Sequence, residues 1–330
     1  MNDNLILQAQ KFELHYFFND KSHLLNAFVR NKCESELLSI AKEVAKILEV
    51  DIEIDSEALQ EGGLVDIWKF LGKNSGQIAI VIAILTLIMS RVPLNNSELS
   101  NLQIENAKLE KIERLLRIKK LKQESNQSET VDYDKINDLI DTTVSHLSQE
   151  IKVKKHKSNF FTSISKTSKV THLTARALTD NYIEINKTEV VKSDFANHIL
   201  ETDDLPTKID EDATIEIVAP VLKKGKYKWK GTYAKLDKII DFSIKDNKFK
   251  TEVQQGQIPF ISGTCMDCIL EIKQKVDEFG EIKNKGYSVA KVLRVHDETT
   301  SFETEQGRKH RKEKNAEIIQ MSLFDKENDV

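Results

Sequence analysis

Cysteine and proline are scarce in this chain of 330 residues. Three cysteines (Cys33, Cys265 and Cys268) are too few for the disulfide framework of a small secreted protein. Four prolines and eleven glycines leave room for long regular elements. The first residues contain no basic stretch followed by an apolar one, so no signal peptide is expected. These absences predict a cytoplasmic protein.

A strong net charge and a catalytic motif are also missing. The formal net charge is −4, which gives no overall attraction to nucleic acid, so any such binding would depend on local basic patches. The eight histidines are scattered, without the spacing of a metal site or of a nucleophile and its base. The sequence therefore favours a non-enzymatic protein without a cofactor; the alternative is an enzyme with an unfamiliar catalytic motif.

The cysteine pair at 265–268 is the closest approach to a metal motif. In a strand, Cys268 shares a face with Leu270 and Ile272, while Cys265 points to the other face. A zinc site needs two further ligands, and no second pair of cysteines or histidines lies nearby. No metal site is predicted.

The N-terminal residues alternate between strand and helix patterns. Residues 4–18 alternate as a strand, residues 22–49 have helical spacing, and residues 51–58 alternate again. This order predicts a small α/β domain over residues 1–72.

An apolar run follows at residues 77–90 and has two interpretations. It is apolar on all faces, which suits a helix buried in a protein core or in an oligomer. The uncharged window, residues 74–90, is also close to the shortest span that crosses a bilayer. The second interpretation predicts an inner-membrane-associated protein.

Amphipathic patterns continue beyond this run. Leu99, Leu102, Leu109, Ile112 and Leu116 form a stripe flanked by charges, which is typical of a long solvated helix or a short coiled coil. Another helical stripe runs from Ile136 to Leu147. Residues 76–150 are therefore predicted to hold a hydrophobic helix and long amphipathic helices.

A basic patch lies in the next predicted segment, residues 151–212, a basic helix followed by a strand connection. Lysines beside Phe160 and Phe161 can contact phosphates while the aromatic rings stack on bases. The alternative is a basic helix end with both phenylalanines in the core. The candidate nucleic-acid contacts are Lys152, Lys154, Lys155 and Lys157.

Residues 213–296 have the alternation of several short strands. Tyr227, Trp229 and Tyr233 alternate in one of them, and Asp246 is suited to cap a short helix that ends near Gly256. Short strands separated by turns predict a small β-barrel or sandwich, with an OB-like or SH3-like barrel as suitable forms. The whole chain is then α+β: an N-terminal α/β layer, central helices, a C-terminal β domain and a disordered tail.

The tail, residues 297–330, is rich in charge and is predicted to be flexible. It contains the sequence Gln320-Met321-Ser322-Leu323-Phe324. This pentapeptide resembles the motif by which bacterial replication and repair proteins bind the DNA sliding clamp, and all five positions match. The resemblance implies that Leu323 and Phe324 enter an apolar pocket of the clamp and that Gln320 makes polar contacts at its rim. The alternative is a tail strand or helix that packs its apolar residues on its own domain: Ile318, Ile319, Leu323 and Phe324. From average residue usage, a chance match in a chain of this length is on the order of one in a thousand.

Three functional hypotheses follow. The first is a non-enzymatic accessory protein of bacterial, phage or mobile-element origin that docks on the sliding clamp and acts near replicating DNA. The second is a membrane-associated, oligomeric, defence-type effector that uses residues 77–90. The third is a nucleic-acid-binding module that uses the β domain and the basic patch.

Overall fold

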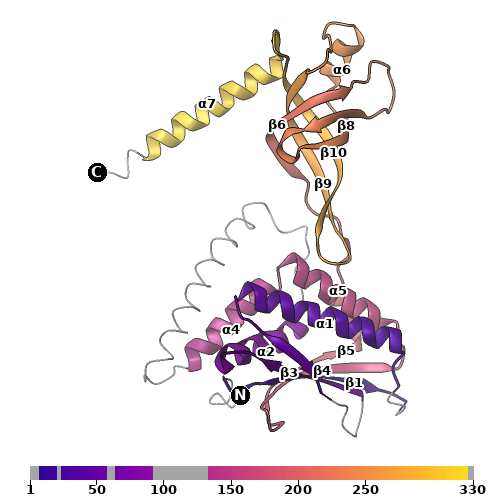
Figure 1. The fold of residues 1–330 in the computed structure, drawn as a ribbon, viewed down its shortest axis with the longest axis vertical. Coiled ribbons are helices and arrows are strands. Elements are labelled where there is room, and N and C mark those ends of the chain that lie inside the picture. The colour runs from indigo at the N-terminus through magenta and orange to yellow at the C-terminus, as the bar shows by residue number, and fades with distance from the viewer. Residues whose placement is uncertain (1–6, 21–23, 58–63, 92–132, 326–330) are drawn as a thin grey trace. The chain divides into compact units, whose positions relative to one another are not determined.

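A computed structural model describes residues 7–20, 24–57, 64–91 and 133–325, with side chains placed for 136–316 of the last range (Figure 1). The fold is α+β, and the chain divides into two compact units. Unit 1 comprises Met1–Asp203 and Val276–Glu281, and unit 2 comprises Asp204–Lys275 and Ile282–Val330. The segments predicted as separate domains up to about residue 203 therefore share one unit. The predicted stripe at 99–116 lies outside the described residues.

Unit 1 is an antiparallel sheet with helices over one face (Figure 1). The strand order is β2-β3-β1-β4-β5, so the first strand of the chain lies in the middle of the sheet. In that strand Phe12, Leu14 and Tyr16 are buried and alternate with polar residues. The elements are β1 (Lys11–Phe18), α1 (Ala27–Ile47), β2 (Glu53–Ser56), β3 (Leu64–Leu71), α2 (Ser75–Ser90), α4 (Tyr133–Leu147), α5 (Ile151–Ser165), β4 (Val170–Leu178), β5 (Glu184–Val191) and the 3-10 segment η3 (Lys192–His198).

The alternate residues of the sheet carry charge and form ion pairs with one another. Glu13 of β1 pairs with Arg176, its register partner on β4. Lys11 pairs with Glu57 at 2.9 Å, and its ammonium group lies 3.6 Å from the ring centroid of Tyr182. This division into an apolar and a charged face is what an antiparallel sheet covered on one side requires.

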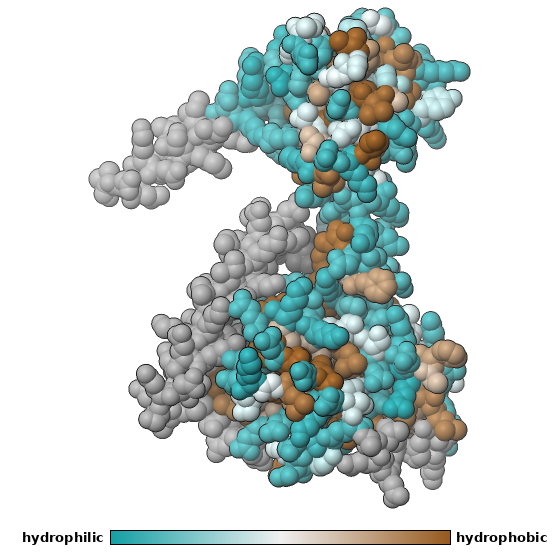
Figure 2. All heavy atoms as spheres, viewed as in Figure 1, coloured by the Kyte–Doolittle hydropathy of each residue, from teal (hydrophilic) through white to brown (hydrophobic). Residues whose placement is uncertain are grey.

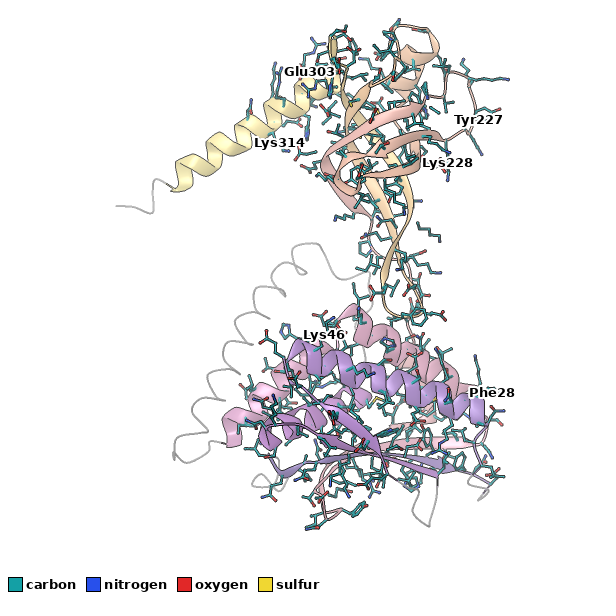
Figure 3. All side chains as sticks on the ribbon, viewed as in Figure 1. Phe28, Lys46, Tyr227, Lys228, Glu303 and Lys314 are labelled. Atoms are coloured by element: carbon teal, nitrogen blue, oxygen red, sulfur yellow. The ribbon has the colours of Figure 1, made fainter. Side chains whose placement is uncertain are left out.

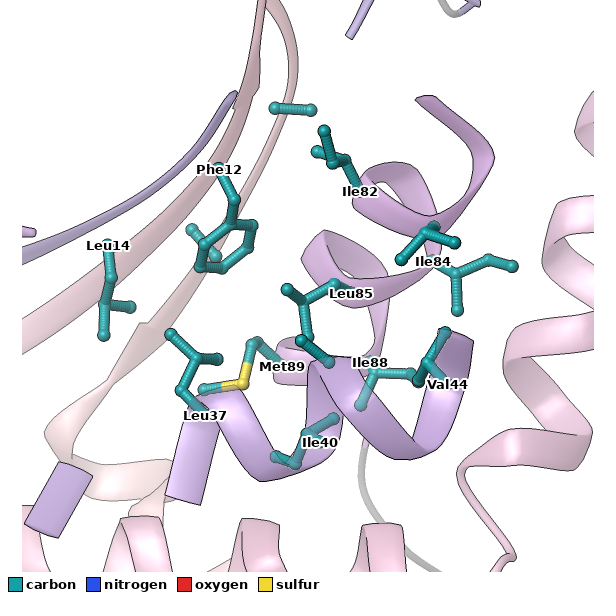
Figure 4. Close-up of a cluster of buried hydrophobic side chains, with 14 of the residues drawn as sticks. Phe12, Leu14, Leu37, Ile40, Val44, Ile82, Ile84, Leu85, Ile88 and Met89 are labelled. Atoms are coloured by element: carbon teal, nitrogen blue, oxygen red, sulfur yellow. The ribbon is translucent and has the colours of Figure 1, made fainter. Parts of the chain in front are cut away.

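Helix α2, the apolar run of the sequence, is the centre of this core (Figure 4). Its residues from Ile78 to Met89 are nearly all buried, and Ile82, Ile84 and Ile88 have no exposed surface. Strands β4 and β5 and helices α1 and α4 all contact it. The prediction of a helix buried in protein is therefore confirmed. Within the described ranges, no helix combines the length and apolarity needed to cross a membrane.

Unit 2 is built on a five-stranded barrel. The strands pair in the order β6-β7-β8-β10-β9, and β9 closes the barrel on β6. The β8–β10 pairing is parallel, and helix α6 lies in the chain between β8 and β9. Of the barrel and the sandwich that the sequence predicts, the structure has the barrel. The elements are β6 (Lys208–Ala219), β7 (Trp229–Tyr233), the 3-10 segment η4 (Ala234–Leu236), β8 (Lys238–Ile244), α6 (Asn247–Gln254), β9 (Cys265–Val276) and β10 (Ile282–His296).

Asp246 and the two cysteines of β9 have the positions that the sequence predicts. The Asp246 side chain accepts a hydrogen bond from the Phe249 amide at 3.1 Å and so caps α6. Cys268 faces the barrel core, whereas Cys265 is partly exposed. Tyr227 differs from the prediction, because it lies in the loop before β7 and is 59% exposed.

The structure also differs from the prediction of a flexible tail from residue 297. Residues Ser301–Glu303 form β11, which pairs with β10, and Glu305–Asp325 form helix α7. The Thr304 hydroxyl caps the helix by accepting from the Gly307 amide at 2.9 Å, and it donates to the Val292 carbonyl at 2.7 Å. Gly307 approaches the Leu293 backbone so closely that a Cβ atom would collide with it. The start of α7 depends on contacts with β10, so the charged sequence of the tail does not reveal it.

Replacing Ile82 by Asp should destroy the fold of unit 1. An unpaired charge in a fully buried position costs several kcal/mol, against a typical domain stability of about 5–15 kcal/mol. Ile82→Val serves as the matched control and should lower stability by only about 0.5–1.5 kcal/mol. Chemical denaturation followed by circular dichroism measures both variants. A cooperative Ile82→Asp transition at the wild-type midpoint would contradict the burial of α2.

Candidate functional site

The predicted basic patch lies on helix α5, and most of it is buried. Lys154, Lys155 and Lys157 are only 2%, 9% and 3% exposed. Helix α5, which carries them, packs against α1 and η3. Three of the four candidate lysines are therefore withdrawn from solvent, and the patch does not offer the phosphate-binding surface that the sequence suggested.

The ammonium groups of these lysines have partners within the fold. Lys157 donates to the carbonyl oxygens of Ile88 and Arg91, at the C-terminal end of α2. A helix leaves its last carbonyls without intrahelical partners, and a lysine at that end satisfies them. Lys155 pairs with Asp203 at 2.7 Å, and Lys152 pairs with Glu281 at 2.6 Å. The patch is therefore a set of structural contacts, which lysine spacing alone cannot reveal.

Phenylalanines 160 and 161 also belong to the core, as the alternative interpretation of this segment holds. Phe160 and Phe161 have no exposed surface and meet edge to face, with ring centroids 5.2 Å apart. The ring of His198 stacks on Phe161 at 4.4 Å. Neither phenylalanine is available to stack on a base.

Burial changes the acid–base behaviour of this region. It lowers the pKa of Lys154 to about 8 and that of Lys157 to about 7. Burial, with the nearby charge of Lys157, lowers the pKa of His198 to about 4. His198 Nδ1 is buried without a hydrogen-bond partner, so the ring has little to stabilise a second proton.

A second polar cluster, which sequence analysis did not identify, joins α1 to α5. The buried Glu36 carboxylate lies 2.6 Å from both His156 Nδ1 and Lys32 Nζ. Asn159 donates to the same carboxylate at 3.3 Å. Burial acts to raise the pKa of Glu36, but hydrogen bonds from His156 and Lys32 outweigh it and lower the pKa. The carboxylate is satisfied by its neighbours, which suits a structural role better than catalysis.

The pentapeptide Gln320–Phe324 falls within the range of helix α7. The start of the helix is fixed to β10 through Thr304 and Gly307. Residues 308–316 are exposed or half-exposed on every face, and the described part is hydrophilic (Figure 2). Lys314, labelled in Figure 3, pairs with Asp212 at 2.6 Å. The side chains of 320–324 lie outside the described residues.

The cysteines show no sign of metal chemistry. Among the side chains that the structure describes, no three His, Cys, Asp or Glu residues converge as a metal site. Burial raises the pKa of the Cys268 thiol and raises that of Cys33 to about 12, so neither is a ready thiolate.

The buried His198 predicts an acid-sensitive step in stability. Its pKa is lower in the folded chain than the ordinary value of about 6.5, so the unfolded chain binds the additional proton between about pH 6.5 and 4. Stability therefore falls as the pH is lowered through this window, by up to about 1.4 kcal/mol per pH unit. His198→Phe keeps the ring stacking on Phe161, and it should remove the part of the pH dependence of stability that His198 causes. Urea denaturation of both proteins across pH 4–7 measures the difference, and identical slopes would contradict the assignment.

No family model matches the chain, and no curated protein or solved structure matches it either. The functional assignment therefore rests on the residues and their geometry.

Proposed function

We propose that this chain is a non-enzymatic accessory protein that docks on the bacterial DNA sliding clamp through Gln320–Phe324 and acts near replicating DNA. The observation that carries the proposal is the match of all five residues to the clamp-binding motif. A bacterial, phage or mobile-element origin follows from the same resemblance.

The attachment of α7 supports this role. The helix is fixed to the barrel at Thr304 and Gly307, and beyond that point its side chains up to residue 316 are largely solvated. A helical segment that is polar on all sides, as residues 308–316 are, gains little from packing on its own domain. Twenty-one helical residues extend about 30 Å, so the motif can be held well away from its attachment.

The expected affinity is modest. Burying Leu323 and Phe324 contributes roughly 1.5–3 kcal/mol each before ordering costs. A rim hydrogen bond from Gln320 adds about 1 kcal/mol, because it replaces a bond to water. Together these contributions come to about 4–7 kcal/mol, which corresponds to the upper micromolar range at best, and a second contact would strengthen the binding.

The membrane hypothesis and a nucleic-acid role for the basic patch have less structural support. A membrane role for residues 77–90 would require α2 to leave the core in which it is buried. A nucleic-acid role for Lys152, Lys154, Lys155 and Lys157 would require three of these lysines to leave buried positions.

We predict that the full chain binds a bacterial sliding clamp with micromolar affinity. Changing Leu323 and Phe324 together to Ala should cost about 3 kcal/mol or more, roughly a hundredfold, because apolar anchors dominate a small interface. Gln320→Ala should cost about 1 kcal/mol. Met321→Leu is the matched control and should be nearly neutral, since the two side chains are close in volume. Isothermal calorimetry measures all four proteins.

Two results would reject clamp docking through this peptide. If the wild-type chain gives no heat and does not compete with a known clamp peptide well above micromolar concentration, the pentapeptide is a coincidence. Equal binding by wild type and the Leu323→Ala, Phe324→Ala variant would also reject the proposed pocket. A pull-down from bacterial lysate, with and without the last dozen residues, checks the interaction with native clamp.

A further inference from the structure

The loop between β6 and β7, residues 220–228, concentrates exposed positive charge. Its sequence is Pro-Val-Leu-Lys-Lys-Gly-Lys-Tyr-Lys, and every residue from 222 to 228 is exposed. Among the described residues, none of its lysines forms an ion pair. They are Lys223, Lys224, Lys226 and Lys228.

Several other lysines of unit 2 differ in this respect. Lys235 pairs with Asp210 at 2.6 Å, and Lys245 and Lys248 pair with Glu271 and Glu305. The loop therefore holds four unneutralised charges within six residues of a protein whose net charge is −4. Such a local charge attracts a polyanion when the whole chain does not.

Tyr227 gives the loop an exposed aromatic ring, which is labelled with Lys228 in Figure 3. The ring is 59% exposed and lies against the backbone of Gly225. Gly225 has φ +151°, and a Cβ atom there would collide with the ring. The glycine therefore gives the loop both its backbone conformation and room for the tyrosine.

The strands beside the loop extend this surface. Lys228 and Lys230 flank the buried Trp229, so both point away from the barrel core. Strands β6 and β8 lie on either side of β7. Val218 on β6 is 54% exposed, and Ile239 on β8 is 59% exposed. Exposed apolar side chains beside a basic loop suit a ligand that has both charge and flat apolar rings.

We propose that the β6–β7 loop and the adjoining outer face of β6, β7 and β8 bind single-stranded nucleic acid. The loop lysines contact phosphates, Tyr227 stacks on a base, and Val218 and Ile239 contact neighbouring bases or sugars. Stacking on Tyr227 requires a base with a free face, which a duplex does not offer. The site is independent of the clamp-binding peptide.

Fluorescence anisotropy of labelled oligo-dT and oligo-U, each about 20 nucleotides long, tests the site on the full chain. The wild-type chain should bind. The logarithm of its association constant should fall with the logarithm of the salt concentration with a slope of about 3, if four lysines each neutralise a phosphate of a single strand. Reversing Lys223, Lys224 and Lys226 to Glu should abolish binding. Tyr227→Ala should weaken it about tenfold without changing the salt slope, and Tyr227→Phe should bind like wild type.

The matched control reverses three exposed lysines of unit 1, Lys42, Lys46 and Lys73, which changes the net charge equally. This control should keep wild-type affinity, and thermal melts should show that all variants fold. Three results would overturn the proposal. The control could lose as much affinity as the loop variant, the loop variant could bind like wild type, or wild type could show no binding at low salt at protein concentrations up to about 100 μM. Loop-dependent binding to phosphatidylserine vesicles without oligonucleotide binding would overturn it in favour of a membrane surface. The Leu323→Ala, Phe324→Ala variant should bind oligonucleotide normally, which separates this test from that of clamp docking.

Discussion

Burial of α2 is the constraint on which unit 1 depends. A helix that is apolar on every face has to be covered on every face, so segments far apart in the sequence must surround it. Strands β4 and β5 and helices α1 and α4 provide this cover. The helix end also needs hydrogen-bond donors, and Lys157 of α5 supplies one. The burial of a lysine that seemed suited to nucleic acid is therefore a consequence of the core helix.

Much of the fold could be predicted because local patterns determine it. Asp246 starts a helix that ends near Gly256, the alternation at 265–276 forms β9, and the apolar run is buried. The division into units could not be predicted, since periodicity shows which face of an element is buried but not what covers it. Helix α7 was missed for a related reason: the cap at Thr304 and the close approach at Gly307 depend on β10.

The candidate sites also divide into those that consecutive residues reveal and those that depend on distant contacts. The pentapeptide is visible in sequence because a linear motif carries its own pattern in consecutive residues. Lysine spacing was misleading in α5, where the partners are backbone carbonyls and carboxylates brought by the fold. The basic loop at 220–228 was not recognised, because Tyr227 and Trp229 alternate like a strand and only the barrel shows that the first is exposed and the second buried.

The central claim is that residues 320–324 form the clamp contact, while unit 1 and the barrel of unit 2 do not. Hydrogen exchange of the full chain, with and without a bacterial sliding clamp, tests this most directly. The account predicts that the clamp slows exchange in peptides covering residues 317–326 and leaves α2 and the barrel strands unchanged. Protection confined to unit 1 or to the barrel, with none in residues 317–326, would contradict it.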